Sequence, residues 1–160
     1  MTRIAILASG SGSNAESIMK AFENSNIIQI SLVISNNSNA GVLARADKFN
    51  VPNVVINSAQ AKEGLLLQAL LNSGADYIVL AGYMKLIPKS IIAAFEKKIL
   101  NIHPSLLPKF KGLNTHERAI RNKEKYSGCT VHFVNSKLDS GKIILQDKVR
   151  VNKNETPKTL

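Results

Sequence analysis

The sequence is poor in cysteine and in aromatic residues. One of its 160 residues is cysteine, none is tryptophan, and Phe, Trp and Tyr together make up 5%. Cys129 alone cannot form a disulfide within the chain, and the Cys and His residues do not cluster at spacings that bind zinc. We therefore expect no metal site, and no surface on which interleaved aromatic rings stack nucleic-acid bases.

Acidic residues are also scarce. The chain has 11 of them against 21 basic residues, a net charge of +10. A basic balance favours anionic partners, but the lysines are scattered and never form a block of five. The charge therefore favours small anionic ligands, and we predict no nucleic-acid partner.

Long apolar runs are absent as well. No segment approaches the roughly 20 apolar residues that a membrane-spanning helix requires, so we expect no membrane association. The apolar run at residues 3–9 soon reaches Gly10, which indicates a first strand and not a secretion signal. We predict a cytoplasmic protein whose residues 1–160 form a single domain.

Apolar runs and helical patterns alternate along the chain, which predicts βαβ units. The expected fold is α/β and Rossmann-like: a mostly parallel twisted sheet with helices on both faces, and an antiparallel element near the C-terminus. Strands are expected at residues 3–9, 27–36, 52–57, 76–82, 98–104, 129–135 and 142–151, and helices at 14–24, 40–49, 58–74, 88–98 and 115–123.

The last residues, NKNETPKTL, carry a helix-start signal. Asn154 or Thr156 is suited to cap a helix that begins with Pro157. The sequence reaches only the first turn of such a helix. We therefore expect that the domain lacks its native C-terminal helix.

A glycine turn joins the first strand to the first helix in ILASGSGSNAES, residues 6–17. Gly10 and Gly12 allow the backbone to turn tightly and to approach a ligand. The backbone NH groups of Gly12, Ser13 and Asn14 would lie where the helix dipole favours an anion, so a phosphate site is predicted. The alternative is an ordinary turn in which Ser13 or Asn14 caps the helix.

The same turn fits the loose dinucleotide fingerprint GxGxxG/A. That fingerprint expects an acidic residue about 20 positions further on, to hold the ribose hydroxyls. The chain has Ser35, Asn36 and Asn37 at that point. The loop therefore favours a phosphorylated substrate over a nicotinamide cofactor.

Polar residues interrupt the apolar strand near residue 100. Asn101 and His103 are two apart, so in a strand their side chains share one face. An Asn amide can donate to an oxyanion, a His can carry a proton at neutral pH, and a nearby carboxylate such as Asp139 would favour the protonated His. These groups suit acyl transfer without a covalent nucleophile. Asp139 could instead form only an Asx-turn, and His132 is expected to be a core residue.

Five segments together resemble the folate-dependent formyltransferase family over nearly the whole chain. They are ASGSGSN (8–14), VLAGYMKLIP (79–88), NIHPSLLPKFKG (101–112), GCTVHFV (128–134) and LDSG (138–141). The resemblance implies 10-formyltetrahydrofolate as the formyl donor. The SGxGSN loop is typical of family members that formylate 5-phosphoribosylglycinamide in purine synthesis, so this small molecule is the implied acceptor.

The resemblance also implies a role for each site residue. Asn101 would orient and polarise the formyl oxygen, His103 would stabilise the tetrahedral intermediate and donate a proton, and Asp139 would tune His103. The phosphate of the ribonucleotide would bind at Gly12, Ser13 and Asn14. The folate would be held by Met84, Lys85, Leu86, Ile87 and Asn101, with Lys62 at its glutamate tail.

Two alternatives remain open. The chain could be another formyl-group enzyme of the same family, such as a formyltetrahydrofolate hydrolase or a transfer-RNA formyltransferase, which share the Asn, His and Asp but not the loop. It could also be a non-catalytic module that binds a nucleotide or phosphate.

Overall fold

The computed structural model describes residues 1–62 and 64–160, which form two compact units. Unit 1 comprises residues 1–99 and unit 2 residues 100–160. Unit 1 contains β1 (Thr2–Ala8), α1 (Ser13–Phe22), β2 (Ile28–Ser35), α2 (Gly41–Lys48), β3 (Asn53–Val55), α3 (Ser58–Lys62), α4 (Leu65–Asn72), β4 (Tyr77–Leu80) and α5 (Lys89–Ala94). Strand β5 (Ile99–His103) crosses the boundary, and unit 2 continues with α6 (Thr115–Arg121), β6 (Tyr126–Phe133) and β7 (Ile143–Arg150).

The strands follow the order β3-β2-β1-β4-β5-β6-β7 in a seven-stranded sheet. In unit 1 the pairs β1–β2, β1–β4 and β2–β3 are all parallel, as the alternating pattern predicted. In unit 2, β6 is antiparallel to both β5 and β7. The Rossmann-like α/β fold with an antiparallel C-terminal element is therefore confirmed.

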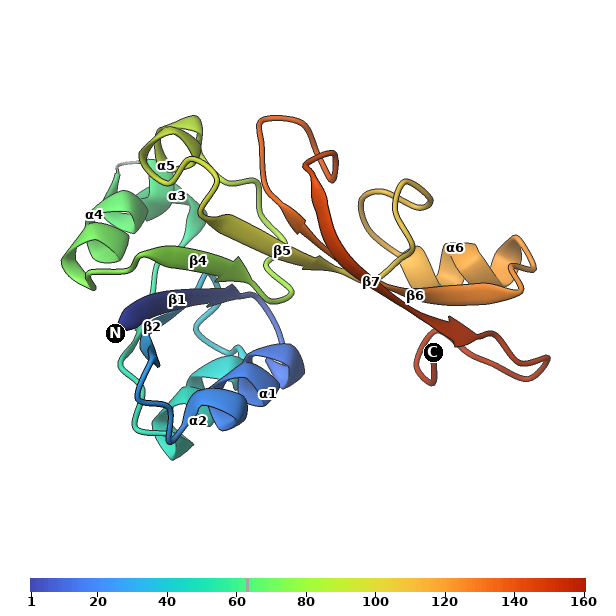
Figure 1. Cartoon of the computed structure of the whole chain (residues 1–160), viewed down its shortest axis with the longest axis horizontal. Helices are drawn as coiled ribbons and strands as arrows, with labels where there is room; N and C mark the ends of the chain where they lie inside the picture. Colours follow the sequence, from blue (N-terminus) through green and yellow to red (C-terminus); the bar gives the residue numbers. More distant parts are fainter. Residues whose placement is uncertain (63) are drawn as a thin grey trace. The chain divides into compact units, whose positions relative to one another are not determined.

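The core of unit 1 lies on both faces of β1. Its residues 5–8 are fully buried, which explains why this strand reads as a continuous apolar run. Ile6 and Ala8 pack with Met19 of α1 and with Val42 and Ala46 of α2. Figure 1 shows α3, α4 and α5 on the other side of β1 and β4.

Two predicted helices have different bounds. The single helix expected at 58–74 is wrong: α3 ends at Lys62 and α4 starts at Leu65, after Gly64, whose positive φ of 88° is left-handed and not helical. Glu63, within that prediction, lies outside the described residues. Helix α5 ends at Ala94, short of the predicted residue 98, because Phe95 leaves the helical region with a φ of −118° and a ψ of 43°.

The last residues make one hydrogen-bonded turn. The Thr156 hydroxyl accepts a hydrogen bond from the backbone NH of Thr159 at 3.3 Å, as the capping hypothesis predicted. The backbone NH of Leu160 donates to the carbonyl of Thr156 at 3.0 Å. Over the described ranges, no helix is long and apolar enough to cross a membrane.

Candidate active site

Strand register brings the polar side chains of unit 2 together. In the antiparallel pair β5–β6, Asn101 lies directly opposite His132, and His103 lies opposite Thr130. Asn101 and His103 share a face, as their spacing predicted, and both reach Asp139 in the loop after β6. We call Asn101, His103, His132 and Asp139 the polar cluster.

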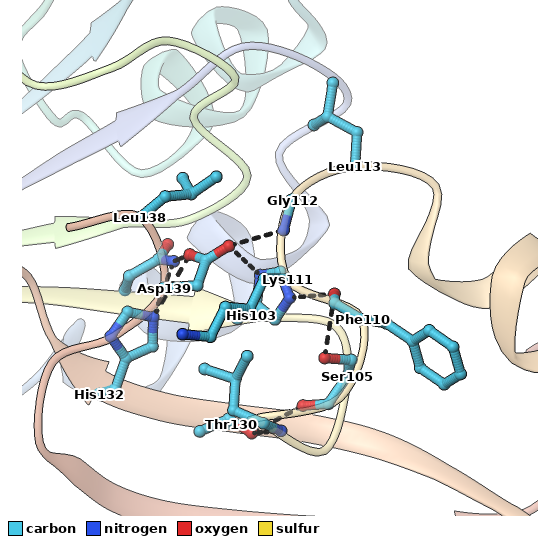
Figure 2. Close-up of polar contacts among 12 residues, drawn as sticks. His103, Ser105, Phe110, Lys111, Gly112, Leu113, Thr130, His132, Leu138 and Asp139 are labelled. Carbon is cyan, nitrogen blue, oxygen red and sulfur yellow. Dashed lines mark hydrogen bonds and ion pairs between the residues drawn. The ribbon is translucent and has the colours of Figure 1, made fainter.

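His103 is held between two acceptors. Its Nε2 lies 2.9 Å from the carbonyl oxygen of Phe110 (Figure 2), and a carbonyl can only accept, so Nε2 carries a proton. Its Nδ1 lies 3.5 Å from Oδ2 of Asp139, and both side chains are almost fully buried. Nδ1 therefore faces the Asp139 carboxylate inside the protein, an arrangement in which a carboxylate can orient an imidazole ring.

The Asp139 carboxylate is the centre of the polar cluster. Oδ2 accepts a hydrogen bond from the backbone NH of Gly112 at 2.8 Å, and Oδ1 accepts one from the Asn101 amide at 3.4 Å. Nε2 of His132 lies 3.7 Å from Oδ1. Asp139 has a positive φ of 44°, a conformation that Asp tolerates better than most residues. The carboxylate therefore joins β5, β6 and the loop at residues 104–114.

A close backbone contact sets the position of the Asp139 loop. The backbone NH of Phe133 donates to the carbonyl of Lys142 at 2.9 Å. A Cβ atom on Gly141 would lie 1.6 Å from the carbonyl oxygen of Phe133, so only glycine permits this approach. Gly141 thus lets the chain return against β6 two residues after Asp139.

The loop that carries the Phe110 carbonyl is fixed by a buried hydroxyl. Thr130 is fully buried; its hydroxyl donates to the carbonyl of Ser105 at 2.6 Å and accepts from the backbone NH of Leu107 at 3.1 Å. The Gln146 amide donates to the Thr130 hydroxyl at 2.8 Å and to the Leu107 carbonyl at 2.9 Å. The hydroxyl of Ser105 donates to the Lys109 carbonyl at 2.6 Å. Strands β6 and β7 therefore support the loop facing His103.

The glycine turn in unit 1 leads directly into α1. Gly12 is the N-cap of α1 with a φ of 79°, and it has no side chain to occupy the helix start. A Cβ there would lie 2.5 Å from Cβ of Val42, so α2 packs directly on the turn. Ser13 and Asn14, in the first helical turn, are exposed. Their NH groups have no partner within the helix by its geometry, so a bound phosphate could accept from them.

Arg45 of α2 also contacts the glycine turn. Its Nε donates to the carbonyl of Ser11 at 2.8 Å, and its guanidinium pairs with Glu16 in the first turn of α1. These contacts tie the turn to the start of α2. Arg45 thus holds the glycine turn from the side of α2, and the exposed residues at the start of α1 face solvent.

The segment expected to hold folate follows β4. Its start is tied to Ser9, whose hydroxyl accepts from the backbone NH of Met84 at 2.8 Å and donates to Oδ1 of Asn36 at 2.5 Å. Met84 and Leu86 are 65% and 81% exposed, so they present an apolar surface. Because β1 and β4 are parallel neighbours, the glycine turn and this segment lie at the same sheet edge.

The other residues assigned to folate differ in exposure. Lys85 is exposed in the same segment, Ile87 is half-buried, and Lys62 is an exposed residue at the end of α3. All of these lie in unit 1, as does the glycine turn, whereas the polar cluster lies in unit 2. That the two sets form one cleft stays a prediction. Within residues 1–62 and 64–160, no group of three or more His, Cys, Asp or Glu side chains is arranged to hold a metal ion.

His132 is the functional candidate that the sequence did not reveal. It is 2% exposed, as a core residue would be, but its Nε2 lies 3.1 Å from the Asn101 amide nitrogen. The position opposite Asn101 depends on the β5–β6 register. An Asn and a His in adjacent antiparallel strands indicate a side-chain contact only when that register is known.

Comparison with known proteins identifies the family of the chain. A profile of the formyl transferase family matches residues 2–160. The chain is 43% identical to phosphoribosylglycinamide formyltransferase of Haemophilus influenzae over 160 residues, which cover 94% of this chain and 74% of that protein.

Solved structures of similar proteins superpose closely. Phosphoribosylglycinamide formyltransferase from Anaplasma phagocytophilum is 40% identical with a TM-score of 0.93, over 98% of this chain and 76% of that one. Glycinamide ribonucleotide transformylase 1 from Symbiobacterium toebii is 39% identical with a TM-score of 0.94, over 99% and 78%. The chain therefore belongs to the formyl transferase family, in the group of the phosphoribosylglycinamide formyltransferases.

Proposed function

We propose that the protein transfers the formyl group of 10-formyltetrahydrofolate to the primary amine of 5-phosphoribosylglycinamide, a step of purine biosynthesis. The observation that carries the proposal is the pairing of His103 with Asp139, 3.5 Å apart, beside the Asn101 amide. The proposal uses them as a proton donor and an amide donor, the two kinds of group that a carbonyl oxygen gaining negative charge requires.

In the proposed reaction the neutral amine attacks the formyl carbon directly. A carbon–nitrogen bond forms, the carbonyl oxygen becomes negative, and the Asn101 amide and the His103 imidazolium stabilise it. The bond from the formyl carbon to N10 of the folate then breaks. N10 takes up a proton and the attacking nitrogen loses one. His103 and Asp139 provide a local donor and acceptor for these transfers.

Binding of the acceptor is proposed at the glycine turn. Gly12, Ser13 and Asn14 would surround the phosphate with backbone NH groups at the positive end of α1. Support comes from the left-handed φ of Gly12 and from its close packing on Val42. The charge of +10 on the chain would attract this anionic substrate.

Binding of the donor is proposed at residues 84–87 and Asn101. The exposed side chains of Met84 and Leu86 offer apolar contact to the pterin ring, and Lys62 would meet the anionic glutamate tail. The mechanism above uses only side chains, backbone and the two substrates. The cytoplasmic location stays a prediction.

The test is a formylation assay with the purified chain. Mass spectrometry should detect formylated 5-phosphoribosylglycinamide when both substrates are present, and the Asn101→Ala and His103→Ala variants should produce far less. Release of free formate without formylated product would instead indicate a hydrolase. Formylation of initiator transfer RNA, or phosphate-ligand binding without any transfer, would identify the other two alternatives.

A further inference from the structure

We propose that His132 is a positioning residue for the reaction, because it fixes which part of the Asn101 amide is presented to the formyl oxygen. This inference rests on the proposed function. His132 lies on β6 directly opposite Asn101 and is 2% exposed. Its ring is close enough to Asn101 and Asp139 to decide how their polar atoms are arranged.

The protonation of the His132 ring follows from its neighbours. Nδ1 lies 2.8 Å from the carbonyl oxygen of Phe133, which can only accept, so Nδ1 carries a proton. The neutral ring then has its lone pair on Nε2. That lone pair faces the Asn101 amide nitrogen at 3.1 Å and accepts one of its two N–H groups.

The two N–H groups of Asn101 are held unequally. One is bound by His132 at 3.1 Å, and the other makes a longer contact of 3.4 Å with Oδ1 of Asp139. The longer contact is the one that a developing oxyanion can replace, because Asp139 keeps its 2.8 Å hydrogen bond from Gly112. His132 therefore acts as the anchor, and the second N–H serves the substrate.

The reversed amide is disfavoured by the same neighbours. If the Asn101 side chain were turned over, its oxygen would face the lone pair of His132 and the carboxylate of Asp139. Both contacts would be between acceptors and therefore repulsive. Among the described residues, the titratable groups that face His132 are Asp139, at 3.7 Å from Nε2, and His103 beyond it. A proton added to Nε2 would remove the anchor.

The kinetic test compares two substitutions of His132. His132→Leu removes the acceptor, and it should lower kcat about 10- to 100-fold while each KM changes by less than about twofold. His132→Gln can place its amide oxygen where Nε2 stands and should recover most of kcat. His116→Leu is the matched control, at a histidine outside the polar cluster, and should retain kcat.

Circular dichroism would verify that each variant is folded. If folded His132→Leu keeps the kcat of the parent chain, or if folded His132→Gln loses as much as His132→Leu, the proposal is wrong. An inactive parent chain would instead overturn the proposed function, which distinguishes the two failures.

A second measurement does not depend on activity. Nitrogen-15 NMR of the parent chain should assign to His132 a protonated Nδ1 and an Nε2 without a proton, and Asn101→Ala should shift the Nε2 resonance. A protonated Nε2 in the neutral ring would overturn the proposal even if every His132 variant failed to fold.

Discussion

His103 and Asp139 form an almost fully buried pair, with 3.5 Å between Nδ1 and Oδ2, although the two residues come from different elements of unit 2. Oδ2 also accepts from the backbone NH of Gly112 at 2.8 Å. One carboxylate oxygen thus connects the end of β5 with the loop that follows it.

Asp139→Asn should lower kcat about 100-fold, because the amide lacks the negative charge and the acceptor oxygen that the proposed proton transfers use. Steady-state kinetics with both substrates would measure the change. Asp147→Asn on β7 is the matched control, because Asp147 is exposed and lies outside the polar cluster. Undiminished turnover in folded Asp139→Asn would refute the role given to this carboxylate.

Gly141→Ala should lower both stability and turnover. The added Cβ would meet the Phe133 carbonyl, so the loop carrying Asp139 must move, at a cost of about 1–3 kcal/mol in the free energy of unfolding. Urea denaturation and kcat would be measured together. Gly10→Ala is the stability control, since nothing lies within 4 Å of a Cβ there. Equal stability of the two variants would contradict the expected contact.

Gly12→Ala should raise KM for 5-phosphoribosylglycinamide by at least about tenfold, equivalent to losing one charge-assisted hydrogen bond. The positive φ of 79° and the contact with Val42 both oppose a side chain, so the backbone NH groups would be displaced. The KM for 10-formyltetrahydrofolate should change much less. Equal increases in the two KM values would show that the turn does not serve the phosphate alone.

Thr130→Val should lower the free energy of unfolding by about 1–3 kcal/mol, although the two side chains have nearly the same shape. The substitution removes the hydroxyl that serves Ser105, Leu107 and Gln146. Chemical denaturation would measure the loss. Thr159→Val, at an exposed hydroxyl, should cost much less, and similar costs at both sites would argue against a structural role for Thr130.

Tyr83 should make stability depend on pH in the alkaline range. Burial raises the pKa of Tyr83 in the folded protein, so folding favours the neutral phenol. This contribution is fully present below the unfolded pKa of about 10 and is lost as the pH rises through the folded pKa.

Alkaline absorbance titration would measure this effect. The difference between the parent chain and Tyr83→Phe should show one phenol that ionises later than a free tyrosine. Denaturation at high pH should show a weaker pH dependence for Tyr83→Phe. Ionisation of Tyr83 at the ordinary tyrosine value would contradict the prediction.

The sequence was sufficient to predict the alternating fold because apolar periodicity depends on local spacing. It identified Asn101, His103 and Asp139, and the structure brings these three together. It missed the break at Gly64, since the apolar spacing continues through it and only the backbone φ of 88° interrupts the helix. It assigned His132 to the core and did not predict its contact with Asn101. That contact depends on the β5–β6 register, which local periodicity does not contain.

Residues 101–139 supply every hydrogen-bonding partner that the described structure gives the side chains of the polar cluster, from Asn101 on β5 to Asp139 in the loop after β6. These partners therefore lie in one uninterrupted stretch of the sequence. A chimera that takes residues 1–99 from another family member would exchange the glycine turn and leave the residues of these hydrogen bonds unchanged.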